Sequence, residues 1–122
     1  MKKDILNKKD IEKLVNLFYD KVKKDNTIGH FFSGNFNMEK HLEIMYKFWE
    51  NIVFYTGSYN GNPMDKHFEV HAKTPLSKKD FQKWTKLFNE SVDELYIGEK
   101  ADLIKLKASN IAAVMQMQIL KG

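Results

Sequence analysis

The chain has 122 residues, of which twenty are lysine and none is arginine or cysteine, and this length allows one domain with its own core. The lack of cysteine excludes disulfides, iron–sulfur clusters and thiolate-ligated metals, and scattered lysines without arginine argue against a nucleic-acid partner. A charged N-terminus and the absence of an apolar run of bilayer-spanning length predict a soluble, cytoplasmic protein with no membrane partner.

The first part of the chain predicts one long helix and one short one. Apolar residues recur at intervals of three and four over residues 8–24, which predicts an amphipathic helix with Asn7 as its N-cap and Tyr19 pointing inward. A short helix or turn with two phenylalanines follows and ends at Ser33 and Gly34.

A second long helix is predicted from its N-cap Asn37 to about Thr56. Apolar residues cover most of its circumference, and this pattern predicts burial on two sides. His41, Met45 and Phe48 share one face of this helix.

Residues 57–61 contain glycine and asparagine and interrupt the helical pattern. A short helix is then predicted within residues 62–75, because asparagine and proline at its start suit the N-cap and the first helical position. It carries His67, Phe68 and His71, the two histidines lying one turn apart.

Two further helices complete the chain. Ser77 is predicted to cap the first, whose inward stripe includes Trp84 and which closes at Gly98. The last begins at about Glu99. No segment predicts a strand, so the expected architecture is a single all-α domain over residues 1–122.

Polar-tipped residues from four different helices lie on or beside apolar faces: Tyr19, His41, Trp84, and either His67 or His71. Each alone is typical of a core residue whose polar tip is satisfied locally. Together they indicate a cofactor, because several buried donors from separate helices are hard to satisfy unless they converge. A neutral imidazole in an apolar pocket is the commonest anchor for haem iron in a small helical protein.

Several motifs are spread over nearly the whole chain and share their order and spacing with one known family. They are Phe18-Tyr19; Gly29-His30-Phe31-Phe32; His41, seven residues before Phe48-Trp49; Tyr59-Asn60-Gly61-Asn62-Pro63-Met64-Asp65-Lys66-His67; and Phe81-Gln82-Lys83-Trp84 with Leu87-Phe88. As a set they resemble the truncated haemoglobins, in particular the third group. The resemblance implies a truncated globin fold, a helical sandwich around haem b.

The resemblance also implies roles for individual residues. Tyr19, His41 and Trp84 would line the distal, gas-binding side of the haem, and Phe32 would pack against the ring. His67 would be the proximal iron ligand and the metal-binding residue, because the family carries its ligand in the motif Asn-Pro-Met-x-x-His.

Met45 and Phe68 complete the predicted set of haem-contacting residues. His71 stays open as the alternative iron ligand, because its spacing to Trp84 is closer to that of the family. His67 is preferred because a difference in length is easily absorbed in the loop that follows.

The predicted function is the binding of dioxygen, and of NO or CO, at the iron. The phenol of Tyr19 and the indole of Trp84 can donate hydrogen bonds to the negatively polarised outer atom of a dioxygen ligand, and this slows its release. Slow release favours sensing, scavenging or NO/O2 chemistry over bulk oxygen delivery. No catalytic residue is assigned.

Three alternatives stay open. Nitric oxide dioxygenation would need a separate reductase, since the chain has no flavin or nicotinamide domain, and peroxidase activity would be weak without an arginine beside His41. A non-haem metal site could use His67 and His71 with Asp65 or Glu69, but it lacks convincing further ligands. The chain could also be a helical interaction module without a cofactor, in which the aromatic residues would serve only as core residues.

Overall fold

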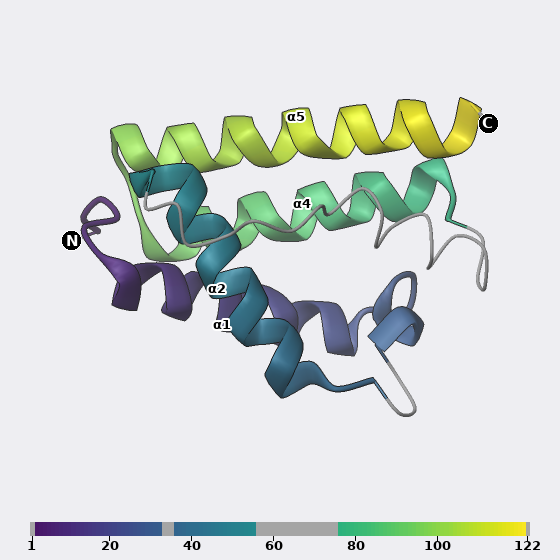
Figure 1. The fold of residues 1–122 in the computed structure, drawn as a ribbon, viewed down its shortest axis with the longest axis horizontal. Coiled ribbons are helices and arrows are strands. Elements are labelled where there is room, and N and C mark those ends of the chain that lie inside the picture. Colours follow the sequence, from purple (N-terminus) through teal and green to yellow (C-terminus); the bar gives the residue numbers. More distant parts are fainter. Residues whose placement is uncertain (1, 33–35, 56–75, 122) are drawn as a thin grey trace.

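The computed structural model describes residues 2–32, 36–55 and 76–121, with side chains up to residue 119. Its elements are α1 (Lys8–Lys24), the 3-10 helix η1 (Gly29–Phe32), α2 (Met38–Phe54), α4 (Lys78–Leu95) and α5 (Glu99–Lys121), shown in Figure 1. The described residues form no sheet, and the one β-bridge among them joins Lys3 to Tyr96. The short helix predicted within residues 62–75 lies outside the described residues.

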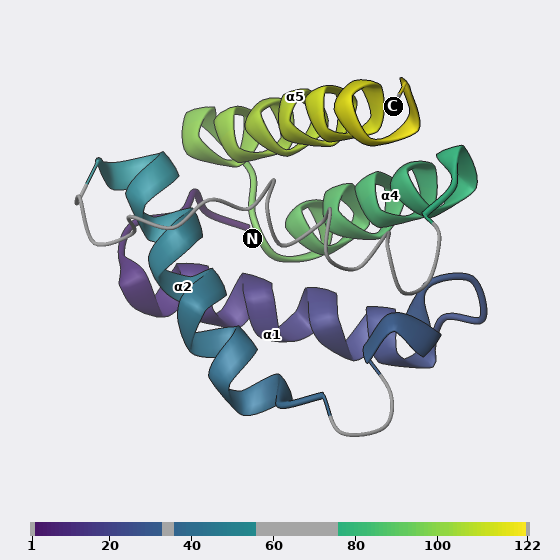
Figure 2. The ribbon, with the colours of Figure 1, turned by 45° about the vertical axis from the view of Figure 1, so that its right-hand side comes forward.

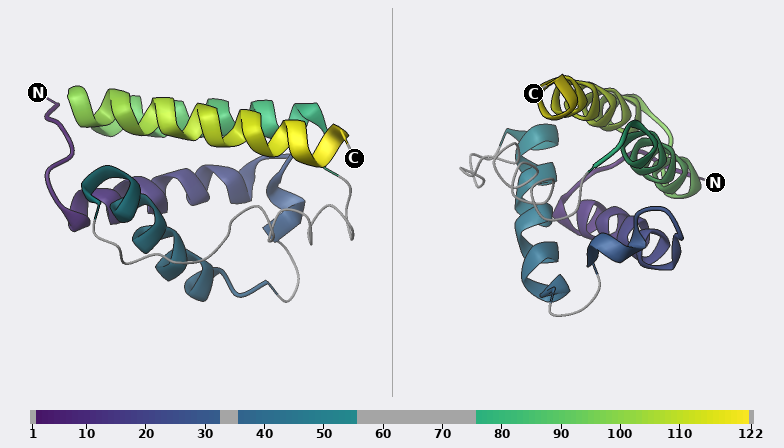
Figure 3. Two further views of the ribbon diagram at one scale, coloured as in Figure 1. Left: turned by 45° about the horizontal axis from the view of Figure 1, so that its top comes forward. Right: turned by 90° about the vertical axis from the view of Figure 1, so that its right-hand side faces the viewer.

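The helices pack as two pairs. α4 and α5 run antiparallel side by side, and α1 lies along α4 on the side away from α5 (Figures 1 and 2). α2 crosses α1 at a steep angle, and its C-terminal part reaches α5, as the end-on view in Figure 3 shows. None of the described helices is long and apolar enough to cross a membrane.

The three predicted N-caps that lie within the described residues are confirmed. Asn7, Asn37 and Ser77 each accept a hydrogen bond from the backbone N–H three residues ahead. At Ser77 the cap is reciprocal, because the Asp80 carboxylate accepts the Ser77 N–H at 2.8 Å and completes a capping box. These local signals place the helix starts where the sequence predicts them.

The end of α1 lies at Lys24 as predicted, whereas the ends of α2 and α4 were predicted less well. α2 ends at Phe54, two residues before the predicted end, and Tyr55 caps it in the left-handed region with φ of 56°. α4 ends at Leu95 and not at Gly98, because the following residues leave the helix and pair with the N-terminal arm, residues 2–7.

The N-terminal arm also caps α5. The Asp4 carboxylate accepts the Lys100 and Ala101 N–H groups, each at 2.9 Å. Gly98 makes this approach possible, since its φ is +143° and a Cβ there would lie 2.5 Å from Asp4 Cγ. The arm and the start of α5 are therefore joined although they lie at opposite ends of the chain.

The core is formed by the four described α-helices and the N-terminal arm. Its fully buried large side chains include Phe18 of α1, Phe88 of α4 and Ile104 of α5. Phe48 and Trp49, which the sequence predicts as packing residues, are both buried in it. A smaller buried cluster joins the start of α4 to the end of α5 through Phe81, Met115 and Ile119.

The predicted two-sided burial of α2 is met in part. Phe48, Trp49 and Val53 are buried, whereas Ile44 and Tyr55 are exposed. The remaining apolar residues of the helix are half-buried; they are Met38, Leu42, Met45, Tyr46, Ile52 and Phe54. The wide apolar surface of α2 is thus only partly covered by protein.

Candidate functional site

Four rings meet where α1, η1 and the start of α2 come together, and we call Tyr19, Phe32, Phe36 and His41 the corner cluster. The centroid of the Tyr19 ring lies 5.6 Å from that of Phe32 and 5.0 Å from that of His41. Phe36 lies 5.1 Å from Phe32 and 5.2 Å from His41. Most of these contacts are edge-to-face, the arrangement that aromatic rings favour.

A hydrogen bond of 2.9 Å joins the Tyr19 hydroxyl to His41 Nε2. Tyr19 is buried, with 5% of its surface exposed, and this burial raises the pKa of its phenol well above the ordinary value. The hydroxyl therefore keeps its proton at every physiological pH. It can donate that proton to His41 or to a ligand beside it.

Trp84 belongs to a second group of rings, stacked on one another. It stacks on Phe88 at 5.6 Å with an interplanar angle of 11°, and Phe88 stacks on Trp49 at 4.7 Å. The Phe18 ring connects this group to the corner cluster, because it lies 4.8 Å from Tyr19 and 5.6 Å from Trp84. Among the described residues, none accepts a hydrogen bond from the Trp84 indole N–H.

The structure therefore brings Tyr19, Phe32 and His41 into direct contact and connects Trp84 to them through one ring. Met45 follows His41 by one turn on α2 and packs, half-buried, against the core. The remaining predicted site residues, His67, Phe68 and His71, lie outside the described residues. Among the residues that the structure describes, no group of three potential metal ligands gathers.

Phe36 was missed by sequence reasoning. It lies in a loop, where no periodicity marks it as inward-facing. A local signal exists nevertheless, because the residue before an N-cap often packs against the fourth residue of the helix. With Asn37 as the N-cap, these two positions are Phe36 and His41.

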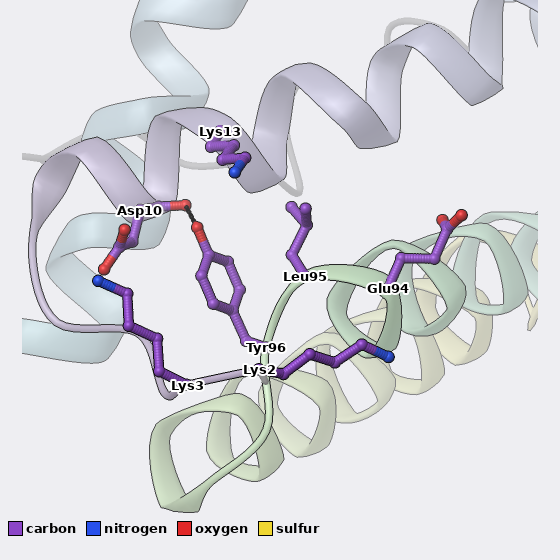
Figure 4. A pocket seen from close by; sticks show the side chains of 7 residues that line it. All are labelled: Lys2, Lys3, Asp10, Lys13, Glu94, Leu95 and Tyr96. Carbon is purple, nitrogen blue, oxygen red and sulfur yellow. Dashed lines mark hydrogen bonds between the residues drawn. The ribbon is translucent and has the colours of Figure 1, made fainter.

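A surface pocket of about 760 Å³ lies elsewhere, between the N-terminal arm, the start of α1 and the end of α4 (Figure 4). Its lining residues are Lys2, Lys3, Asp10, Lys13, Glu94, Leu95 and Tyr96. The Tyr96 hydroxyl donates to the Asp10 carbonyl at 2.9 Å, and burial, followed by the nearby Asp10, raises its pKa to about 12. The pocket mixes lysines with carboxylates, and none of the predicted site residues lines it.

Comparisons with known proteins agree with the fold and with the sequence motifs. The protein-family model of the bacterial-like globins matches residues 4–119. A group 3 truncated haemoglobin of Campylobacter jejuni is 32% identical over 126 residues, which cover 99% of this chain and 97% of that protein. The crystal structure of group III truncated haemoglobin from Campylobacter jejuni matches with a TM-score of 0.86 at 31% identity, over 98% of this chain and 95% of that one.

All three comparisons extend over nearly the whole chain and point to one family. Membership of a globin family implies haem binding, and globins bind diatomic gases. The all-helical fold and the predicted third-group resemblance are thereby confirmed. The chain belongs to the bacterial-like globins, as a truncated haemoglobin of the third group.

Proposed function

We propose that this globin binds haem b and holds dioxygen, and also NO or CO, on the side of Tyr19, His41 and Trp84, with His67 as the proximal ligand. The observation that carries the proposal is the hydrogen bond between Tyr19 and His41 inside an aromatic cluster. We propose ligand sensing, scavenging or NO/O2 chemistry as the role, because two distal donors slow the release of the gas, and slow release suits these roles better than bulk delivery.

The described residues fit a haem. Phe32, Met45 and Trp84 pack against the core yet stay half-buried, and a flat apolar ring beside them would complete their burial. The donor set also fits, since a phenol, an imidazole and an indole can each donate one hydrogen bond to a small polar ligand. Protein pockets for cofactors are commonly apolar with a few such donors.

When bound, haem supplies an iron that takes up the diatomic gas and exchanges electrons. The residues of the chain supply the hydrogen-bond donors and the apolar surroundings. Tyr19 stays protonated and offers its hydroxyl proton, and Trp84 offers its indole N–H. The apolar rings exclude water and strengthen both hydrogen bonds. NO/O2 chemistry would in addition require a separate reductase as partner, to return the iron to the ferrous state.

The first test is the visible absorption spectrum of the chain with haem supplied, recorded ferric, then reduced, then with CO. We expect a Soret band that sharpens and shifts when CO is added, as for a histidine-ligated haem. A spectrum that stays flat after titration with haem would contradict the proposal.

The proximal ligand is tested by two matched variants. His67→Ala should lose haem or bind it much more weakly, because the iron loses its protein ligand, whereas His71→Ala should keep it. Haem retention after gel filtration, measured at the Soret band, separates the two. Loss in His71→Ala with retention in His67→Ala would move the ligand to His71.

A further inference from the structure

Phe36 is placed by the way α2 begins. Asn37 caps the helix by accepting the Lys40 N–H at 3.1 Å, and Phe36 directly precedes this cap. A residue in that position packs back on the fourth residue of the helix, which here is His41. The two rings lie 5.2 Å apart with an interplanar angle of 65°.

His41 is thereby enclosed by three rings. Tyr19 lies on its inner side and is bonded to its Nε2, whereas Phe36 is 38% exposed and is the most accessible ring of the corner cluster. Phe32 contacts both Tyr19 and His41. A movement of the imidazole away from Tyr19 therefore also changes its contacts with Phe32 and Phe36.

Phe36 differs from Phe32 in one respect. Within the described residues its ring contacts Phe32 and His41 but not Tyr19. Removing the Phe32 ring would disturb Tyr19 directly. Removing the Phe36 ring leaves the direct ring contacts of Tyr19 in place and acts first on His41 and Phe32.

We propose that Phe36 is a positioning residue that holds His41 against Tyr19 and so limits the rate at which a diatomic gas reaches the haem. The inference rests on the proposed function, since it concerns entry to the same site. With Phe36 in place His41 closes the approach beside Tyr19. Without it the imidazole swings away more often and the approach opens.

The test is CO association after flash photolysis of the full-length, haem-loaded chain. Phe36→Ala should raise the association rate constant about two- to ten-fold, the range expected when the one aromatic contact between Phe36 and His41 is lost. Phe36→Tyr retains the ring at a partly exposed position and should restore the wild-type rate. Leu106→Ala, at an exposed apolar residue of α5, should leave the rate unchanged.

A double-mutant cycle separates positioning from a general loosening of the fold. His41→Ala should raise the CO association rate at least as much as Phe36→Ala, and adding Phe36→Ala to it should change nothing more. An equal acceleration in the presence and absence of His41 would overturn the proposal.

A second readout needs no haem. In NMR spectra of the full-length chain, with haem or without, the nuclear Overhauser contacts between the Tyr19 and His41 rings should weaken in Phe36→Ala. Contacts of undiminished intensity would overturn the proposal. If Phe36→Ala shows a normal Soret band and an unchanged CO association rate, the proposal for Phe36 is wrong but the proposed function still stands. If the wild-type chain forms no Soret band, both the proposed function and the proposal for Phe36 are wrong.

Discussion

The hydroxyl of Tyr19 has two possible partners in the proposed site. It is hydrogen-bonded to His41 in the described structure. A phenol can donate one hydrogen bond and accept another at the same time. If His41 donates to the Tyr19 oxygen, the phenol proton is left for a ligand. A hydrogen bond from His41 can therefore orient the Tyr19 hydroxyl so that its proton points toward the gas.

Replacing Tyr19 by phenylalanine tests this role. Tyr19→Phe keeps the ring in contact with Phe18 and Phe32 but removes the donor, so dioxygen should dissociate faster. A hydrogen bond worth about 1 to 3 kcal/mol in such a setting corresponds to an increase of about five- to a hundred-fold. Stopped-flow displacement of dioxygen by CO measures the rate.

Trp84→Phe is the matched change at the second donor. It preserves an aromatic ring to stack on Phe88 and removes only the indole N–H. It should also accelerate dissociation. Wild-type rates in both variants would contradict the assignment of Tyr19 and Trp84 as distal donors.

Sequence alone selected Tyr19, Trp84 and His41 for the proposed site and did not select Phe36. Tyr19 and Trp84 stand on amphipathic helices, where the period of the apolar stripe shows which residues face inward. His41 was assigned through its motif and its place on a helix face. Phe36 stands in a loop, and only the contact between the two sides of an N-cap brings it to His41.

At the scale of the helices, the starts were predictable, and so was the end of α1 at Lys24, but the ends of α2 and α4 were not. Asn7, Asn37 and Ser77 act on N–H groups three residues away, so the signal and its effect lie in one short window. The start of α5 uses Asp4, which is 96 residues from Lys100 in the chain. A cap of this kind cannot be seen in a local pattern, because it exists only once the N-terminal arm has docked.

Asp4 and Gly98 should therefore act as one unit in stability. Asp4→Ala leaves two N–H groups of α5 without their acceptor and should lower the free energy of unfolding by about 1 to 2 kcal/mol. Gly98→Ala should cost about 1 to 3 kcal/mol, since alanine tolerates the positive φ poorly and its Cβ would displace Asp4.

The two effects should not add. Once Gly98→Ala has displaced the Asp4 side chain, removing that side chain should lower the free energy of unfolding by less than it does in the wild type. Urea unfolding of the two single variants and the double variant measures the coupling. Asp20→Ala, at an exposed aspartate of α1, serves as the control. Strict additivity would show that the cap and the glycine are independent.

At the scale of the molecule, two aspartates connect segments that are distant in the chain. Asp4 connects the N-terminal arm to α5, and Asp25 connects the end of α1 to α4. The Asp25 carboxylate accepts the Thr27 N–H at 2.7 Å and forms an ion pair with Lys83 at 3.3 Å. Each bond of this kind restrains the packing of one helix pair on the other.

The whole fold was predictable chiefly because motifs from most of its helices could be matched together. Apolar periodicity gives the helices and their inward faces but does not fix their crossing angles. The steep crossing of α2 over α1 depends on contacts such as Tyr19 with His41, which connect residues of different helices. Such pairings appear only in three dimensions.

The same aspartates predict how the fold responds to acid. Burial by itself would raise the pKa of Asp4 and Asp25, but backbone N–H donors, together with Lys100 beside Asp4 and Lys83 beside Asp25, outweigh it and lower both pKa values below the ordinary 3.8. A carboxyl whose pKa is lower in the folded state than in the unfolded state contributes its full stabilisation at pH values above its pKa in the unfolded state. This stabilisation is lost as the pH falls below about 3.8 and passes the folded pKa.

The free energy of unfolding should therefore decrease as the pH is lowered from 5 toward 3, as measured by urea titrations followed by circular dichroism. The variant Asp4→Ala/Asp25→Ala starts from a lower stability at pH 5, but it should lose less of that stability on acidification, because two of the protons that drive acid unfolding can no longer bind. Asp20→Ala, made in parallel, should follow the wild-type curve. If the double variant loses as much stability as the wild type over this range, the acid response must come from other carboxylates, and the two long-range bonds are not what makes the fold sensitive to acid.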